Sequence, residues 1–138
     1  MSHKTILLVE DNEVNQRLLV LQLSRLGVAD VDVVGNGIEA LAWLDRHTCE
    51  LVLADCQMPG MDGYAMTRAI RARALRRRDG GRLPVVALSA GVMDDDKAAC
   101  RAAGMDDHVS KPTRLDTLRA ALETWIALPP ARGAGRQP

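Results

Sequence analysis

Short runs of consecutive apolar residues recur along the chain, and each is followed by a turn and by apolar residues at helical spacing. Strands that are apolar throughout, rather than alternating, are typical of a parallel sheet covered on both faces. Five strand–helix repeats of this kind predict a doubly wound α/β domain. The predicted strands are residues 6–9, 31–34, 51–54, 85–88 and 108–110, and the predicted helices are 14–26, 38–44, 60–75, 94–103 and 115–128.

Polar side chains stand where four of the predicted strands end. Glu10 and Asp11 follow the first strand, Asp55 follows the third, Ser89 the fourth and Lys111 the fifth. In sheets of this class the ligand site lies beyond the carboxyl ends of the strands, where the strand order reverses. We therefore expect these five residues to share one edge of the sheet.

The three acids at this edge raise an electrostatic problem. Carboxylates in contact repel by about 4 kcal/mol per pair at an effective dielectric near 20, so an isolated cluster would take up protons. A divalent cation removes this repulsion. A site with oxygen ligands alone favours Mg²⁺, and phosphate oxygens commonly complete the coordination shell of that ion. The residue types therefore predict a magnesium-dependent site for phosphate chemistry.

Each of these residues, taken singly, also has a structural interpretation. Residues 10–12 could cap the first helix, Ser89 could fit a tight strand end, and Lys111 could be a solvated loop lysine. Pro59, Gly60 and Gly63 are interpreted as turn residues, and Asp94 or a neighbour is predicted to cap the start of the fourth helix. The functional interpretation is favoured because several separate strand ends would otherwise carry these residue types by accident.

Four sequence stretches carry a family resemblance. They are ILLVEDNEVNQRLL, LVLADCQMPGMDG, VVALSA and GMDDHVSKP, in this order. Together they resemble the receiver domain of two-component response regulators over residues 4 to about 128, and the first two are most similar to receivers of hybrid sensor histidine kinases. The resemblance implies a flavodoxin-like (βα)5 fold with strand order 2-1-3-4-5, with residues 1–128 as the domain and 129–138 as a disordered tail or linker.

The resemblance also implies a metal site and an acceptor. Asp55 would take a phosphoryl group from the phosphohistidine of a histidine kinase or a histidine phosphotransfer domain. Asp11, Asp55 and the backbone carbonyl of Gln57 would bind Mg²⁺, with Glu10 acting through a metal-bound water. Such a domain catalyses its own phosphorylation and hydrolysis, so whether it counts as an enzyme is left open.

The family's switch involves the fourth and fifth strands. Ser89 would hydrogen-bond the phosphoryl group, Lys111 would pair with it, and the Lys111–Pro112 peptide bond would be cis. The resulting change would reach an output partner through the fourth helix, fifth strand and fifth helix. The family usually has Tyr or Phe where this chain has His108, and we weigh a switch role and a plain structural role for His108 equally.

Two other functions stay open at this level. One is a degenerate receiver that acts as a phosphorylation-independent protein-binding scaffold. The other is a magnesium-dependent phosphohydrolase, although those enzymes commonly carry a second Asp two residues after the nucleophile, where this chain has Gln57. The small residues Ala90 and Gly91 predict a short-lived acyl phosphate.

Composition bears on three questions: nucleic-acid binding, the state of the cysteines and membrane insertion. Lys plus Arg and Asp plus Glu both number 18, and only Trp43, Tyr64 and Trp125 are aromatic, which disfavours direct nucleic-acid binding. The three cysteines are expected to be reduced thiols. No stretch has the roughly 20 apolar residues of a membrane span, so we expect a cytoplasmic chain, or part of a membrane-anchored hybrid kinase if it is a fragment. Its oligomeric state, including a homodimer, is left open.

Arginine is concentrated in residues 68–82, which contain seven of them. A solvated helix end is the favoured interpretation, and a docking patch for an acidic partner is the alternative.

Overall fold

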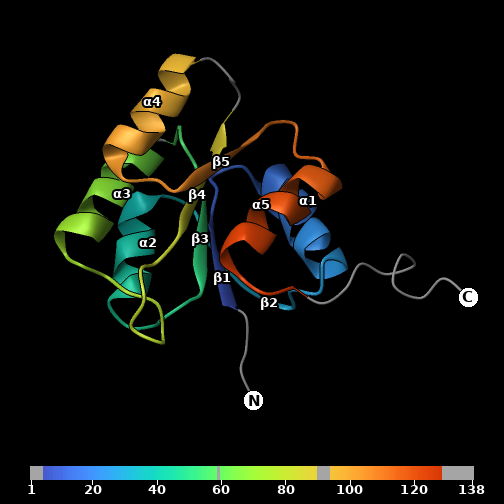
Figure 1. The fold of residues 1–138 in the computed structure, drawn as a ribbon, viewed down its shortest axis with the longest axis horizontal. Helices are drawn as coiled ribbons and strands as arrows, with labels where there is room; N and C mark the ends of the chain where they lie inside the picture. Colours follow the sequence, from blue (N-terminus) through green and yellow to red (C-terminus); the bar gives the residue numbers. More distant parts are fainter. Residues whose placement is uncertain (1–4, 59, 90–93, 129–138) are drawn as a thin grey trace, which may run out of the picture.

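The computed structural model describes residues 5–58, 60–89 and 94–128. Five parallel strands form one sheet in the order β2-β1-β3-β4-β5, which confirms the predicted fold class and strand order (Figure 1). The strands are β1 (Thr5–Val9), β2 (Asp30–Val34), β3 (Leu51–Asp55), β4 (Val85–Ser89) and β5 (Asp107–Ser110), and the helices are α1 (Glu13–Arg25), α2 (Gly37–Leu44), α3 (Gly63–Ala72), α4 (Asp94–Ala103) and α5 (Leu115–Trp125).

Helices cover both faces of the sheet. Helices α1 and α5 lie on one face, and α2, α3 and α4 lie on the other (Figure 1). Successive residues of a strand point to opposite faces, so Ile6 and Leu8 join the core under α1 and α5, while Leu7 and Val9 join the core under α2 and α3. Every residue of β1, β3 and β4 is buried, which explains why these strands are apolar except for Thr5 at the start of β1, Asp55 at the end of β3 and Ser89 at the end of β4.

Two predicted helices are too long at their ends. The third helix begins at Gly63 rather than at residue 60, because the Asp62 side chain accepts a hydrogen bond from the Ala65 N–H and caps the helix. The same helix ends at Ala72 rather than at residue 75, and Ala74 then adopts a φ of +54°. Helix α5 ends at Trp125 because Ile126 is extended.

Most of the arginine run pairs within the domain. Arg71 donates to the carbonyl oxygens of Gly104 and Leu83 at 3.0 and 2.8 Å and to Asp106 Oδ2 at 2.7 Å, which ties α3 to the starts of β4 and β5. Arg82 shares Asp106 at 2.8 Å. Arg77 pairs with Asp79 and Arg73 with Asp45. Five of the seven arginines are exposed, which agrees with the favoured interpretation of a solvated helix end, whereas Arg71 has a structural role. The docking patch stays a prediction.

None of the helices in residues 5–58, 60–89 and 94–128 has the length and apolar character to cross a membrane.

Candidate active site

The carboxyl ends of the strands place the predicted site residues together. Strands β1 and β3 are neighbours, and the connections leave them in opposite directions, so the order of the sheet reverses between them. Glu10 follows β1 and Asp55 ends β3. Carboxylate oxygens of Glu10, Asp11 and Asp55 all lie within 4.8 Å of one another. The acid cluster that the strand ends predict is therefore present.

Lys111 faces this cluster from the end of β5. Its Nζ donates to Asp55 Oδ2 at 3.0 Å and lies 3.6 Å from Glu10 Oε1. Burial alone would lower the pKa of Lys111, but the hydrogen bond and the negative charge of Asp55, together with Glu10, outweigh it and raise that pKa. The ammonium group is therefore held charged against the two acids.

Glu10 is the most enclosed acid of the site. Its side chain has no solvent exposure, and burial, supported by the nearby charge of Asp55, raises its pKa, while the Asn12 N–H and Lys111 oppose the shift. Glu10 Oε2 accepts from the Asn12 N–H at 3.2 Å, whereas the buried Oε1 has no hydrogen-bond partner among the described residues. A buried carboxylate oxygen left unsatisfied beside two other acids fits a hard cation such as Mg²⁺.

The predicted cap at residues 10–12 is formed by Asn12. Its side chain accepts from the Asn15 N–H at 3.0 Å and begins α1. Gln16 on the first turns of this helix donates to the Glu10 carbonyl oxygen at 2.6 Å. Asp11 stays exposed at the mouth of the cluster. Capping and site formation therefore involve different residues of the same short segment.

The segment after β3 folds back on the Asp55 carboxylate. The Gln57 N–H donates to Asp55 Oδ1 at 3.1 Å, while the Gln57 side chain is exposed. Gly60 has a φ of +80°, as a turn glycine does. The two oxygens of Asp55 are thus held from two sides, one by a backbone N–H and the other by Lys111.

The sequence predicts Gly63 as a turn residue, but Gly63 is the first residue of α3 and lies against the end of β3. A Cβ atom there would lie 2.5 Å from the Asp55 carbonyl oxygen and 3.1 Å from the Cys56 Cα. The Gly63 N–H donates to the Cys56 carbonyl oxygen at 3.1 Å. Glycine therefore allows α3 to start directly against the end of β3. Its position inside the helix predicted at residues 60–75, where an interior glycine would cost about 1 kcal/mol relative to alanine, is the signal that could have revealed this.

Gly63→Ala is expected to lower the free energy of unfolding by about 2–3 kcal/mol, because the added methyl must push backbone away from backbone. Urea denaturation measures this change. Gly35→Ala is the matched control, since the nearest atom to its Cβ would be the flexible Glu39 Oε1 at 3.4 Å. Equal stability of the two variants would show that the start of α3 does not depend on this close approach.

The remaining predicted residues lie on β4 and β5. Ser89 is buried at the end of β4, and its carbonyl oxygen accepts from the Lys111 N–H at 2.7 Å. The Lys111–Pro112 peptide bond is cis, as the resemblance implies. His108 is half-buried and lines a cavity of about 130 Å³ against α4, together with Lys97 and Cys100.

Some expectations concern residues outside the described ranges. These are the effect of Ala90 and Gly91 on access to the site, the turn role of Pro59, the cap of the fourth helix and the tail 129–138.

Comparison with known proteins identifies the family. The model of the response regulator receiver domain matches residues 6–123. The hybrid signal transduction protein dokA of Dictyostelium discoideum is 39% identical over 123 residues, which are 89% of this chain and 7% of that protein. The sensor histidine kinase RcsC of Salmonella typhimurium is 38% identical over 120 residues, which are 87% of this chain and 12% of RcsC. The chain thus spans only a small part of these relatives.

Solved structures agree with these matches. A crystal structure of the receiver domain of a sensor histidine kinase from Pseudomonas aeruginosa, with magnesium coordinated in its active-site cleft, is 39% identical with a TM-score of 0.77. The match covers 90% of this chain and 98% of the chain in that crystal structure. A match at 26% identity and a TM-score of 0.80, covering 89% of this chain and 88% of that chain, occurs in the co-crystal structure of Ypd1 and the receiver domain of Ssk1 from Saccharomyces cerevisiae. The chain belongs to the response regulator receiver domain family and is most similar to the receivers of hybrid sensor histidine kinases.

Proposed function

We propose that this domain accepts a phosphoryl group on Asp55 from a phosphohistidine, in a Mg²⁺-dependent reaction. The observation that carries the proposal is the setting of the Asp55 carboxylate. It ends a buried strand, accepts from Lys111 Nζ at 3.0 Å, and has oxygens of Glu10 and Asp11 within 4.8 Å. Acids this close need a cation, and a lysine beside the acceptor suits an incoming phosphate.

The metal would be held by Asp11, Asp55 and the backbone carbonyl of Gln57, with Glu10 acting through water. The oxygen-only donor set and the unsatisfied Oε1 of Glu10 support this assignment. The receiver structure from Pseudomonas aeruginosa, which contains magnesium, supports it independently. When bound, Mg²⁺ neutralises negative charge on the transferring phosphoryl group.

The chain's own residues then position and stabilise the reacting groups. An oxygen of Asp55 attacks phosphorus, the P–N bond to the donor imidazole breaks, and a P–O bond forms to give an acyl phosphate. Lys111 is placed to pair with the phosphoryl oxygens, and the Gln57 N–H keeps the carboxylate oriented through Oδ1. Ser89, at the end of β4, would hydrogen-bond the phosphoryl group once it has arrived.

The donor would be a histidine kinase or a histidine phosphotransfer domain. The relatives dokA and RcsC, and the complex of Ypd1 with a receiver domain, support this choice. Phosphorylation would change the surface formed by α4, β5 and α5 and so reach an output partner. His108, which faces α4 from β5, would take the place of the family's aromatic switch residue.

The proposal is tested by incubating the domain with acetyl phosphate and separating the products on a phosphate-affinity gel. We expect a retarded band that requires Mg²⁺, disappears with EDTA and is removed by hydroxylamine, as an acyl phosphate is. Absence of the band would favour the phosphorylation-independent scaffold. Rapid hydrolysis of unrelated phosphate esters without a retarded band would favour the phosphohydrolase.

A further inference from the structure

Three arginine side chains meet at a cavity of about 310 Å³ beside the end of α3. Its lining combines these arginines with apolar side chains: Arg71, Arg76, Arg82, Ile70 and Leu75. Because Arg71 bonds to the residues that precede β4 and β5, the cavity lies at the amino edge of the sheet. Strand β5 spans four residues at about 3.3 Å each, so this edge is roughly 13 Å from Lys111 and the acid cluster.

Arg76 and Arg82 stand directly opposite each other in a short antiparallel bridge. The segment between them closes tightly, since the Arg77 N–H donates to the Gly81 carbonyl oxygen at 3.0 Å. Opposite residues of an antiparallel pair have their Cβ atoms about 5 Å apart on the same face, and like charges in this arrangement destabilise the pair. The backbone therefore holds two positive side chains together at one cavity.

A single carboxylate balances the charge of this group. Asp106, whose side chain is 8% exposed, accepts from Arg71 at 2.7 Å and from Arg82 at 2.8 Å. Arg76 forms no ion pair within residues 5–58, 60–89 and 94–128. Burial lowers the pKa of Arg71, and the charges of Arg82 and Arg76 lower it further, while Asp106 opposes the shift. Three guanidinium groups and one carboxylate leave an excess of two positive charges at the cavity.

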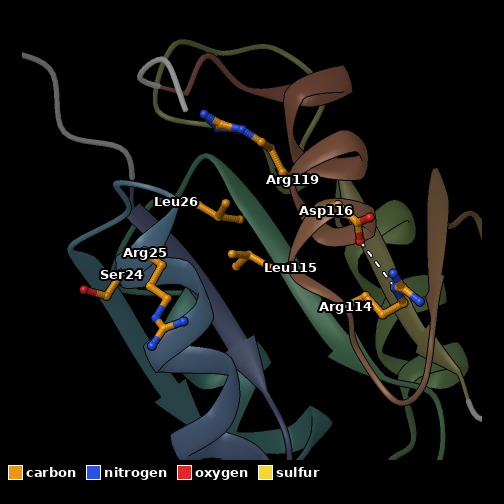
Figure 2. A pocket seen from close by; sticks show the side chains of 7 residues that line it. All are labelled: Ser24, Arg25, Leu26, Arg114, Leu115, Asp116 and Arg119. Atoms are coloured by element: carbon orange, nitrogen blue, oxygen red, sulfur yellow. Dashed lines mark hydrogen bonds and ion pairs between the residues drawn. The ribbon is translucent and has the colours of Figure 1, made fainter. Parts of the chain in front are cut away.

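A larger groove between α1 and α5, of about 930 Å³, is also lined by arginines, but their side chains do not converge (Figure 2). Figure 2 shows the guanidinium groups of Arg25, Arg114 and Arg119 on different sides of the groove. Arg114 pairs with Asp116 at 3.5 Å, and Arg119 pairs with Glu123 at 3.6 Å. The cavity beside α3 differs because the fold concentrates an unbalanced positive charge there.

We propose that the cavity beside the end of α3 binds a small phosphate monoester, with the phosphate group between Arg76 and Arg82. Such a group carries about 1.5 to 2 negative charges near pH 7, which matches the positive excess, and guanidinium groups bind phosphate oxygens in bidentate fashion. Ile70 and Leu75 supply an apolar surface for the organic part of the ligand. The volume is within the range of about 300–1,000 Å³ that is usual for small-molecule sites. The proposal does not depend on phosphoryl transfer, since it concerns the opposite edge of the sheet.

The test adds phenyl phosphate to the ¹⁵N-labelled domain in EDTA and follows the backbone amide signals by NMR. EDTA removes the divalent metal that phosphate chemistry at the acid cluster needs. We expect the signals of Arg76, Arg82 and Gly104 to shift in a saturable way, while those of Asp11 and Asp55 stay in place. Arg76→Gln should weaken binding at least about ten-fold, as the loss of a hydrogen bond to a charged group does.

Arg68→Gln is the matched control, because Arg68 is an exposed arginine of α3 that is not among the residues lining the cavity. This variant should bind phenyl phosphate like the wild type. Benzenesulfonate has a similar shape and a single negative charge, so it should bind several-fold more weakly. The dispersion of the amide signals verifies that each variant folds. Labelling by acetyl phosphate and Mg²⁺ should be unchanged in Arg76→Gln, so the cavity and the phosphorylation site succeed or fail separately.

Several results would overturn the proposal. They are the absence of a saturable shift in the wild type, shifts confined to the acid cluster, and equal weakening of binding by Arg76→Gln and Arg68→Gln. Equal binding of benzenesulfonate would exclude a specific site for a phosphate monoester. Binding of the domain to vesicles that contain phosphatidic acid, without binding of phenyl phosphate, would assign these arginines to a lipid surface instead.

Discussion

Asp55→Asn is expected to abolish phosphorylation of the domain while leaving its fold intact. The amide has almost the same shape as the carboxylate and can still accept from Lys111 Nζ or from the Gln57 N–H through its carbonyl oxygen. It lacks the anionic oxygen that attacks phosphorus, and it also removes one of the three acids of the cluster. The retarded band on a phosphate-affinity gel after incubation with acetyl phosphate and Mg²⁺ should disappear.

Asp45→Asn is the matched control for this loss. Asp45 is an exposed acid after α2 with a loose pair to Arg73 at 3.7 Å. This variant should be labelled to the same extent as the wild type. If Asp55→Asn were labelled as strongly as the wild type, the acceptor would have to be another group, and the proposed function would be wrong.

Lys111→Met is expected to slow phosphorylation by about 100-fold, since a preorganised charge aimed at the reacting oxygens typically contributes this much. Methionine keeps most of the length of the side chain and removes only the ammonium group. Without Mg²⁺ the variant should also lose about 2 kcal/mol of unfolding free energy, because Glu10 and Asp55 would face each other without their cation. The initial rate of labelling by acetyl phosphate and urea denaturation in EDTA measure the two effects.

The control for charge removal is Lys97→Met on α4. Lys97 is half-buried but lines the small cavity beside His108 rather than the acid cluster. We expect its labelling rate to match that of the wild type. Addition of Mg²⁺ should restore part of the stability of Lys111→Met, because the metal supplies the positive charge that the side chain has lost. An unchanged labelling rate in Lys111→Met would exclude it from the reaction.

The strand ends show which parts of the site can be predicted from local sequence patterns. A strand buried on both faces must be apolar, so the polar residue that ends it is visible in the sequence. Parallel pairing then brings such ends to one edge, and this is why Glu10, Asp55 and Lys111 could be placed together from the sequence. Their hydrogen-bonding geometry could not be predicted in the same way. The 3.0 Å between Lys111 and Asp55 joins residues that are 56 positions apart.

Helix ends and arginines were predicted less well. The third helix is shorter than its apolar pattern because the Asp62 cap, not the pattern, decides where it begins. Five arginines of the run are exposed, but the structural pairing of Arg71 with Asp106 was not predicted, because Asp106 lies 35 residues further along the chain. Sequence spacing gives no information on a pairing of that range.

The sequence by itself determined the α/β class, the family, and the residues that share the carboxyl edge of the sheet, because periodicity and strand termination are local properties of the chain. Only the tertiary structure decided that Gly63 lets α3 start against the end of β3, that Glu10 Oε1 is left unsatisfied among the described residues, and that Arg71 ties α3 to the starts of β4 and β5. Those features depend on how segments far apart in the chain pack against one another, and packing distances are not encoded in the pattern of any single segment.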